Sequence, residues 1–277
     1  MTTNKTLNDA YNGVVARYWA GSKNELGACR NGLCALGYFG HTIYVKDITP
    51  NKIESYIQHL RDNGNKNPTI NRKLAALSKM LRYAYNMEWT DRIPRIEKTK
   101  ESKNRIRWLT KEEEQKLLYV LLEANKKEMA DLVVFLIDTG ARVGEAIRLE
   151  WRDVANGKVT FWDTKNGESR TIPLTKRAWR TMQELRENGK AGPFYTMNQS
   201  AFNHTWNHVR DIMGMTEDKE FVPHALRHTC ASRLVQAGIP ITAVKEYLGH
   251  KSIQVTLRYA HLSPAQLQEA TNALEVA

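Results

Sequence analysis

The stretch Thr139-Gly-Ala-Arg-Val-Gly-Glu145 ends one helical pattern and begins another. An apolar helix is predicted through Leu132-Val-Val-Phe-Leu136, and the Thr139-Gly140 pair breaks it. Arg142 then lies at the start of a second helix, where backbone N–H groups and the positive end of the helix dipole favour a bound phosphate. Glu145 is placed to orient Arg142, although this pair taken alone is better explained as a surface ion pair between positions i and i+3.

A β-hairpin is predicted next, from two β-rich runs. Lys158-Val-Thr-Phe-Trp-Asp-Thr164 and Ser169-Arg-Thr-Ile-Pro-Leu174 are joined around Asn166-Gly167, a pair that tolerates positive φ angles. Pro173 cannot donate a ladder hydrogen bond, so the second strand is expected at a sheet edge. Lys165 would lie at the hairpin tip, where the simplest interpretation of a lone lysine is a solubilising turn residue.

Another helix is predicted from His224 to Gly238. Its apolar stripe consists of Leu226, Cys230 and Leu234. His224 and Arg227 are three residues apart and share another face of this helix. An imidazole beside a guanidinium suits a proton-transferring group next to an anion clamp. The neighbouring His228 is interpreted as a structural residue.

Two short motifs follow. Tyr247-Leu-Gly-His250 predicts a helix end, because Gly249 is a natural helix stop that would direct His250 out of the helix. A lone histidine there is more often a cap or a surface residue. Residues 252–261 predict a short helix whose expected buried face consists of Ile253, Leu257 and Ala260. Tyr259 is expected off that face and therefore free to react, although a tyrosine in such a place is normally a partly packed surface aromatic.

These segments together supply two arginines, one lysine, two histidines and one tyrosine, a set that suits phosphoryl transfer to a protein nucleophile. Arginines neutralise the non-bridging oxygens as charge builds in the transition state. A phenol, whose usual pKa is about 10, needs nearby cations and a base, and a leaving 5′-oxygen needs a proton donor. No carboxylates show the obvious paired spacing of a magnesium site, so we expect chemistry without a metal or cofactor.

Residues 1–90 predict several short helices. Thr49 and Pro50 form a helix start, and Gly64 ends a run with apolar residues at helical spacing. A later helix begins near Thr69, and its expected buried face consists of Ile70, Leu74, Leu77, Leu81 and Tyr85. Its cations project from other faces, either as a solvated surface or as contacts to DNA phosphates. They are Arg72, Lys73, Lys79 and Arg82.

Residues 91–107 lose the apolar period and contain Pro94, which indicates a linker between two domains. A basic linker can lie along a phosphate backbone. The cations of this segment are Arg92, Arg95, Lys98, Lys100, Lys103, Arg105 and Arg107. Thr110-Lys-Glu-Glu113 then forms a capping box that opens a second domain, residues 108–277.

The charge distribution favours a polyanionic partner. Of 41 basic and 30 acidic residues in the 277-residue chain, 19 basic and 9 acidic ones lie in residues 1–107, and such a basic end suits nucleic acid.

Hydrophobic residues make up 42% and charged residues 26%, as in globular proteins. The chain has no membrane-length apolar run, no secretory signal at its start and no disulfide framework among its three cysteines. We therefore expect a cytoplasmic protein.

The motifs resemble those of the tyrosine recombinase (phage integrase) family in order, spacing and surrounding residues, over roughly residues 110–267. They are Thr139–Glu145, Lys165 on its hairpin, His224-x-x-Arg227, Leu248-Gly-His250 and Tyr259 in Arg-Tyr-Ala-His. The resemblance implies a mainly α fold with a small β-sheet (α+β). It would comprise a helical core-binding domain (1–90), a basic linker (91–107) and a mixed catalytic domain of the DNA breaking-rejoining type.

The resemblance also implies a role for each matched residue. Tyr259 would attack a scissile DNA phosphate, giving a 3′-phosphotyrosyl link and a free 5′-hydroxyl. His224 would act as base or acid, and Lys165 would protonate the leaving oxygen. The phosphate would be bound by Arg142, Arg227 and His250.

Members of the family act as homotetramers on two double-stranded DNA sites, with a C-terminal helix docked on a neighbour. Here Ser263-Pro264 would cap that helix, and its apolar stripe consists of Leu267, Ala270 and Leu274. That stripe would equally well pack on its own domain. Because the helices begin by about Leu7, we expect no separate arm-binding domain. The need for an accessory directionality factor stays open.

Three hypotheses remain. The leading one is an integrase that inserts or excises a phage or other mobile element. A type IB topoisomerase-like enzyme would cut and rejoin DNA without exchanging strands, and the Leu-Gly-His and C-terminal segments disfavour it. A DNA-binding regulator that kept the fold and lost catalysis is the third, and the complete six-residue set argues against it.

Overall fold

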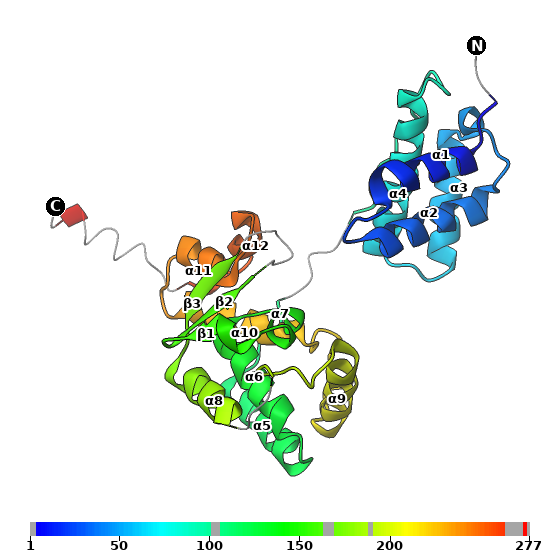
Figure 1. Cartoon of the computed structure of the whole chain (residues 1–277). Helices are drawn as coiled ribbons and strands as arrows, with labels where there is room; N and C mark the ends of the chain where they lie inside the picture. Colours follow the sequence, from blue (N-terminus) through cyan, green and yellow to red (C-terminus); the bar gives the residue numbers. More distant parts are fainter. Residues whose placement is uncertain (1–3, 101–105, 163–168, 188–190, 264–273, 276–277) are drawn as a thin grey trace. The chain divides into compact units, whose positions relative to one another are not determined.

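The structure is a computed structural model that describes residues 4–100, 106–162, 169–187, 191–263 and 274–275. The chain divides into two compact units, residues 1–103 and 104–277 (Figure 1). Helices dominate and the strands form one small sheet, which confirms the predicted fold class. No helix in these described ranges is both long and apolar enough to cross a membrane.

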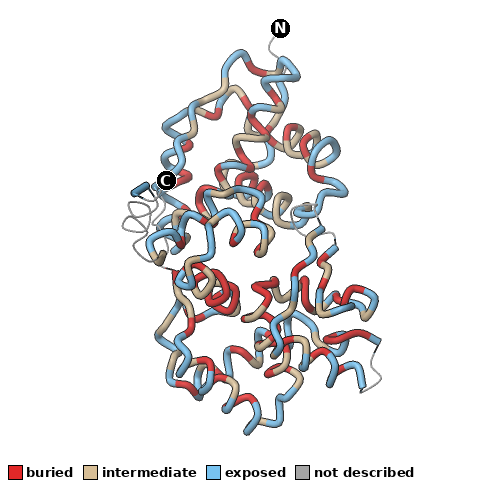
Figure 2. Tube along the Cα trace, turned by 90° about the vertical axis from the view of Figure 1, so that its left-hand side faces the viewer, coloured by how far each residue is buried: buried red, intermediate tan, exposed pale blue. Residues whose placement is uncertain are grey.

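The first unit is a helical bundle in which α4 packs against α1, α2 and α3. Its elements are α1 (Leu7–Val14), the π-helix η1 (Val15–Trp19), α2 (Glu25–Phe39), the 3-10 helix η2 (Val45–Asp47), α3 (Pro50–Asp62) and α4 (Asn67–Asn86). The predicted start of α3 is confirmed, because the Thr49 hydroxyl accepts a hydrogen bond from the backbone N–H of Lys52. Buried stretches, red in Figure 2, lie inside this unit and form its own hydrophobic core.

Helix α4 differs from the prediction at both ends. It begins at Asn67 rather than near Thr69, because Pro68 fits the first turn of a helix. Tyr85, predicted in the core, is 45% exposed, and Ala84 is buried instead. Successive residues point roughly 100° apart around a helix, so the side chain after a buried alanine can face solvent. The assignment of Tyr85 to the core is therefore wrong.

After α4 the chain has no helix or strand up to Lys100 and is held to that helix by side-chain hydrogen bonds. The side-chain oxygen of Asn71 accepts from the backbone N–H of Thr99 at 2.8 Å, and its amide nitrogen donates to the Thr99 carbonyl at 2.9 Å. The amide of Asn67 donates to the carbonyl of Lys100 at 2.6 Å. Residues 101–105, which include the predicted DNA contacts Lys103 and Arg105, lie outside the described residues.

The second unit combines helices with a three-stranded antiparallel sheet of order β1-β2-β3. Helix α6 packs against α5, α8 and α10 and forms the centre of this unit. The elements are α5 (Lys111–Glu123), α6 (Lys127–Thr139), α7 (Val143–Ile147), η3 (Trp151–Asp153), β1 (Val154–Ala155), β2 (Lys158–Phe161), β3 (Arg170–Pro173), α8 (Lys176–Glu187), α9 (Gln199–Ile212), α10 (His224–Gln236), α11 (Ile241–Leu248), α12 (Ile253–Leu257) and η4 (Ala260–Leu262).

The predicted hairpin is confirmed in its two strands. In β2 and β3, Val159 pairs with Ile172 and Phe161 pairs with Arg170. β3 lies at the edge of the sheet, as expected for a strand that contains Pro173. The tip between the strands, residues 163–168, lies outside the described residues, and so does Lys165.

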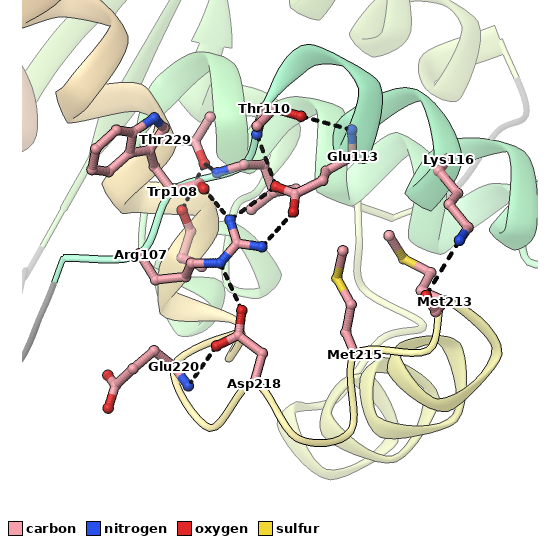
Figure 3. A network of polar contacts seen from close by, with 12 residues as sticks. Arg107, Trp108, Thr110, Glu113, Lys116, Met213, Met215, Asp218, Glu220 and Thr229 are labelled. Atoms are coloured by element: carbon pink, nitrogen blue, oxygen red, sulfur yellow. Dashed lines mark hydrogen bonds and ion pairs between the residues drawn. The ribbon is translucent and has the colours of Figure 1, made fainter.

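Arg107 anchors the start of the second unit (Figure 3). Its guanidinium donates two hydrogen bonds to the carboxylate of Glu113, at 2.8 and 2.5 Å, and one to Asp218 at 2.8 Å. Glu113 also completes the predicted capping box with Thr110, which is confirmed. The hydrogen bond that Arg107 donates to Glu113 is the main cause that raises the pKa of Arg107. This cation of the predicted linker is thus neutralised within the protein.

The chain after α11 departs from the predicted pattern. Leu257 is 43% exposed and Ala260 is also exposed, whereas Thr256 and Tyr259 are buried. Helix α12 has only five residues, and a 3-10 turn follows, so regular helical spacing does not extend to Tyr259. Tyr259 packs in a small apolar cluster with Cys230 and other side chains, and its predicted position off the core is wrong. The predicted C-terminal helix falls mostly outside the described residues.

Candidate active site

Gly140 creates the turn that presents Arg142. It ends α6 with a φ of +61°, in the left-handed region that favours glycine. A Cβ at this position would lie 2.4 Å from Cδ2 of Leu248 and 3.1 Å from Sγ of Cys230. A side chain would therefore be strained as well as crowded here. The turn makes Arg142 the N-cap residue of α7, as predicted from the sequence.

Glu145 holds this arginine from one turn further along α7. Its carboxylate accepts hydrogen bonds from the backbone N–H of Arg142 at 3.0 Å and from a guanidinium nitrogen of Arg142 at 2.5 Å. It also accepts one from Arg170 at 2.8 Å. Burial alone would raise the pKa of Glu145, but Arg170 and Arg142 outweigh it and hold the pKa at about 2. A buried carboxylate thus fixes two arginines.

Arg170 is a residue that the sequence argument missed. Its side chain is 8% exposed, and its guanidinium lies 4.4 Å from the ring centre of Phe161, its partner in the β2–β3 register. Two of its nitrogens, Nε and Nη1, have no hydrogen-bond partner in the part of the chain that is described. A basic residue on the predicted edge strand, paired with an aromatic residue of the neighbouring strand, is the signal by which the sequence could have identified Arg170.

Arg227 is oriented by two backbone carbonyls. It is 2% exposed, and it donates to the carbonyl of Gly140 at 2.5 Å and to that of Leu248 at 2.6 Å. These carbonyls end α6 and α11, so three helices determine where the guanidinium lies. Burial, together with the charges of Arg142 and Arg170, lowers the pKa of Arg227 to about 10. The group is therefore a buried cation at neutral pH.

A pocket of about 490 Å³ lies where these residues meet, between α7, α9 and the start of α10. Its ionisable lining residues are Arg142, Glu145, Arg148, His224 and Arg227. The only carboxylate of this lining is already bound to two arginines, which leaves a cationic surface suited to an anion. The imidazole of His224 is exposed, but its partial desolvation by neighbouring groups and the charges of Arg227 and Arg142 lower its pKa to about 4, so it is neutral at neutral pH.

His250 follows Gly249, which ends α11 in the left-handed conformation with a φ of +66°, as predicted. The imidazole is 8% exposed, and its Nδ1 lies 2.9 Å from the hydroxyl of Thr256. Burial and the charges of Arg227 and Arg142 lower the pKa of His250 to about 3. Residues from α7 and α10 thus lie within electrostatic reach of this ring.

Tyr259 reaches α10 through His228. Its hydroxyl lies 2.5 Å from Nδ1 of His228, whose ring packs edge-to-face against His224 with 4.7 Å between centroids. Burial raises the pKa of Tyr259 to about 12, although the charge of Arg227 acts in the opposite direction. The interpretation of His228 as merely structural misses this contact with the predicted nucleophile.

The structure thus places five of the six predicted residues in one region of the second unit. Arg142, His224 and Arg227 line the same pocket. His250 and Tyr259 do not line it but interact electrostatically with Arg227. Lys165, the sixth, lies outside the described residues. Among the described residues, no group of histidine, cysteine, aspartate or glutamate side chains is arranged to hold a metal ion.

The predicted DNA contacts of the first unit lie on its surface to different degrees. The exposed ones are Arg72, Arg82, Arg95, Lys98 and Lys100. Lys73 is half-buried and donates to the side chain of Asn65 at 3.1 Å. Lys79 is also half-buried, with its ammonium 3.8 Å from the ring centre of Tyr18.

Known proteins share both units. Residues 107–266 match the model of the phage integrase family, and residues 6–100 match that of the phage integrase SAM-like domain. The integrase of Escherichia phage P2 is 31% identical over 226 residues, which cover 80% of this chain and 64% of that protein. This chain therefore spans less than two thirds of the length of that relative.

Solved structures share the fold. The Tn1549 transposon integrase, in complex with a circular intermediate DNA, matches with a TM-score of 0.82 and 18% identity over 98% of this chain and 99% of that chain. A lambda integrase tetramer bound to a Holliday junction matches with a TM-score of 0.78 and 19% identity over 96% of this chain and 79% of that chain. Because one family model matches more than half of the chain, the protein belongs to the phage integrase family of tyrosine recombinases.

Proposed function

We propose that the protein is a site-specific recombinase that cuts and rejoins double-stranded DNA through a 3′-phosphotyrosyl intermediate. One observation carries the proposal: Arg142, His224 and Arg227 line a single cationic pocket of the second unit. Tyr259 is joined to the same helix as two of these residues through its hydrogen bond to His228. A phosphate anion in the pocket would meet two guanidinium groups close to a phenol.

In the proposed reaction, the Tyr259 oxygen forms a bond to the scissile phosphorus, and the bond from phosphorus to the 5′-oxygen breaks. Arg142 and Arg227 neutralise the negative charge that builds on the phosphate. His250, whose Nδ1 is engaged by Thr256, would present Nε2 to a phosphate oxygen. His224 acts as acid or base, and Lys165 gives a proton to the leaving 5′-oxygen.

The covalent link conserves the energy of the broken bond. A 5′-hydroxyl of another duplex can therefore attack the phosphotyrosine and exchange strands without ATP. The arginines already supply the positive charge that a metal ion would supply in other phosphoryl transferases, so we propose that the reaction is independent of metal. Cleavage in the presence of a chelator such as EDTA tests this part of the proposal directly.

The proposed partners are double-stranded DNA sites and further copies of this chain. The phage P2 relative is an integrase, which supports a role in the integration or excision of a phage or other mobile element in the bacterial cytoplasm. The lambda integrase of similar fold forms a tetramer on a Holliday junction, which supports a homotetramer on two sites here. An accessory directionality factor would decide between integration and excision.

The decisive experiment traps the covalent intermediate on a nicked suicide substrate. Tyr259→Phe removes only the nucleophilic oxygen, so we expect DNA binding to persist and covalent capture to disappear. Tyr247→Phe is the control, because it removes the phenol oxygen of a half-buried tyrosine, which donates to the carbonyl of Asp138 at 2.8 Å. Capture that persists in Tyr259→Phe would refute the assignment. Relaxation of supercoiled DNA without recombinant joints between two marked sites would instead indicate a topoisomerase.

A further inference from the structure

The hydroxyl of Tyr259 has a hydrogen-bond partner that the roles above do not use. It lies 2.5 Å from Nδ1 of His228, a half-buried residue of α10. Tyr259 itself is 3% exposed. Among the described residues, His228 is the hydrogen-bond partner of the phenol oxygen. It therefore contacts the reacting atom before DNA is bound.

Both partners are uncharged at neutral pH. Burial lowers the pKa of His228 to about 3 and raises the pKa of Tyr259 to about 12. A neutral imidazole has one nitrogen without a hydrogen, and that nitrogen accepts hydrogen bonds. In the tautomer whose Nδ1 carries no hydrogen, the phenol of Tyr259 donates to this nitrogen, and its proton then points along the path of a transfer.

We propose that His228 is a catalytic residue that accepts the phenol proton of Tyr259 during DNA cleavage, an inference that rests on the proposed function. As the tyrosine oxygen bonds to phosphorus, its proton moves to Nδ1. The bond from phosphorus to the 5′-oxygen breaks, and a separate acid protonates that oxygen. In rejoining, the 5′-hydroxyl gives its proton back to that separate group and its oxygen bonds to phosphorus. The bond from phosphorus to the phenol oxygen breaks, and the imidazolium returns its proton to the phenol oxygen.

The proton moves together with bond formation, not before it. In the free protein the phenol holds its proton much more tightly than the imidazole would. The phenol oxygen loses basicity as it bonds to phosphorus, and the charge of the bound phosphate offsets the arginines that disfavour an imidazolium. The nucleophile therefore stays protonated and unreactive until a phosphate fills the site.

His224 is less suited to this step. It lines the cationic pocket with Arg142 and Arg227, which places it beside the phosphate. Its contact toward Tyr259 runs through the ring of His228, and among the described residues no hydrogen bond joins His224 to the phenol. The two histidines of α10 thus divide the work, one facing the phosphate and the other facing the nucleophile.

The test measures single-turnover covalent capture by His228→Asn. An asparagine side chain can still accept a hydrogen bond, but it cannot hold the proton. Each protein reacts with two nicked substrates, one with the natural 5′-oxygen and one with sulfur in its place, which leaves without needing a proton. We expect His228→Asn to lose about 10²- to 10⁴-fold in rate, by a similar factor on both substrates.

The control variant is His208→Asn, which removes an exposed imidazole on α9 and should react at the wild-type rate. DNA affinity and melting temperature are measured for each protein, and His228→Gln takes the place of His228→Asn if the latter does not fold. Wild-type capture by the variant would overturn the inference. Recovery of its rate on the sulfur substrate would also overturn it, because His228 would then serve the leaving group.

Failure of the proposed function looks different. In that case wild-type protein forms no DNA–tyrosine adduct on either substrate, and Tyr259→Phe behaves as wild type does. Once the wild-type protein is shown to capture DNA through Tyr259, the comparison of its rate with that of His228→Asn tests the role of His228 alone.

Discussion

The carboxylate of Glu145 accepts a hydrogen bond of 2.8 Å from the guanidinium group of Arg170. Glu145 belongs to α7 and Arg170 starts β3, so the contact joins the turn that carries Arg142 to the hairpin. The two side chains are 4% and 8% exposed. Because this buried ion pair holds a side chain that lines the candidate active site, we expect it to link the stability of the domain to the proposed activity.

Replacement of Arg170 tests this link. Arg170→Met leaves the buried carboxylate of Glu145 without one of its two cationic partners. Breaking a buried pair in this way costs about 3–5 kcal/mol of the free energy of unfolding, which urea titration measures. Capture of DNA should fall as well, because Arg142 loses part of its support. Arg152→Met is the control, since Arg152 pairs with Glu150 at an exposed site and should cost under about 1 kcal/mol.

Acid should weaken the second unit through Glu145. Its pKa is about 2 in the folded protein, against an ordinary value of 4.5. A lowered folded-state pKa contributes stability that is present above pH 4.5 and is lost as the pH falls toward 2. The contribution is of order 3 kcal/mol at neutral pH. Urea unfolding from pH 6 to pH 2.5 should show a steep loss in wild type and a smaller one in Glu145→Gln. Equal slopes in both proteins would contradict this assignment.

Local signals in the sequence were sufficient for much of the fold and of the site. The capping box of Thr110, the helix stop at Gly249 and the N-cap position of Arg142 depend on residues within one or two turns. The edge position of Pro173 follows from its missing backbone N–H. Such features are determined by short-range hydrogen bonds and by allowed backbone angles, which a sequence reveals directly.

Other features depend on segments that are distant in the chain. Tyr259 is buried because it packs against Cys230 of α10, and the spacing within its own helix could not predict this. Arg170 meets Glu145 across 25 residues, and His228 meets Tyr259 across 31. Periodicity shows which residues share a face of one helix, but not which element covers that face. The role of Lys165 stays a prediction.

Gly140 and Gly157 form a matched pair for testing the turn before Arg142. Both have positive φ angles, +61° and +70°, so alanine at either position costs about 1–2 kcal/mol in backbone strain. A Cβ at Gly140 would also lie 2.4 Å from Leu248, whereas nothing lies within 4 Å at Gly157. Overpacking adds about 1–3 kcal/mol. Gly140→Ala should therefore lower the free energy of unfolding, measured with urea, more than Gly157→Ala does, and it should also reduce DNA capture. Equal losses of unfolding free energy in the two variants would show that the crowding at Gly140 is relieved without cost.

The exposed cations near the end of the first unit should control how DNA binding responds to salt. Arg95, Lys98 and Lys100 are exposed, and each phosphate contact makes the slope of log affinity against log salt concentration about 0.9 more negative. Replacing all three by glutamine should make that slope about 2–3 less negative and should weaken binding to any DNA sequence similarly, because phosphate contacts carry no base information. Lys126→Gln removes an exposed cation outside this set and should leave the slope unchanged. Filter binding between 50 and 200 mM salt measures both, and an unchanged slope in the triple variant would place the DNA backbone elsewhere on the protein.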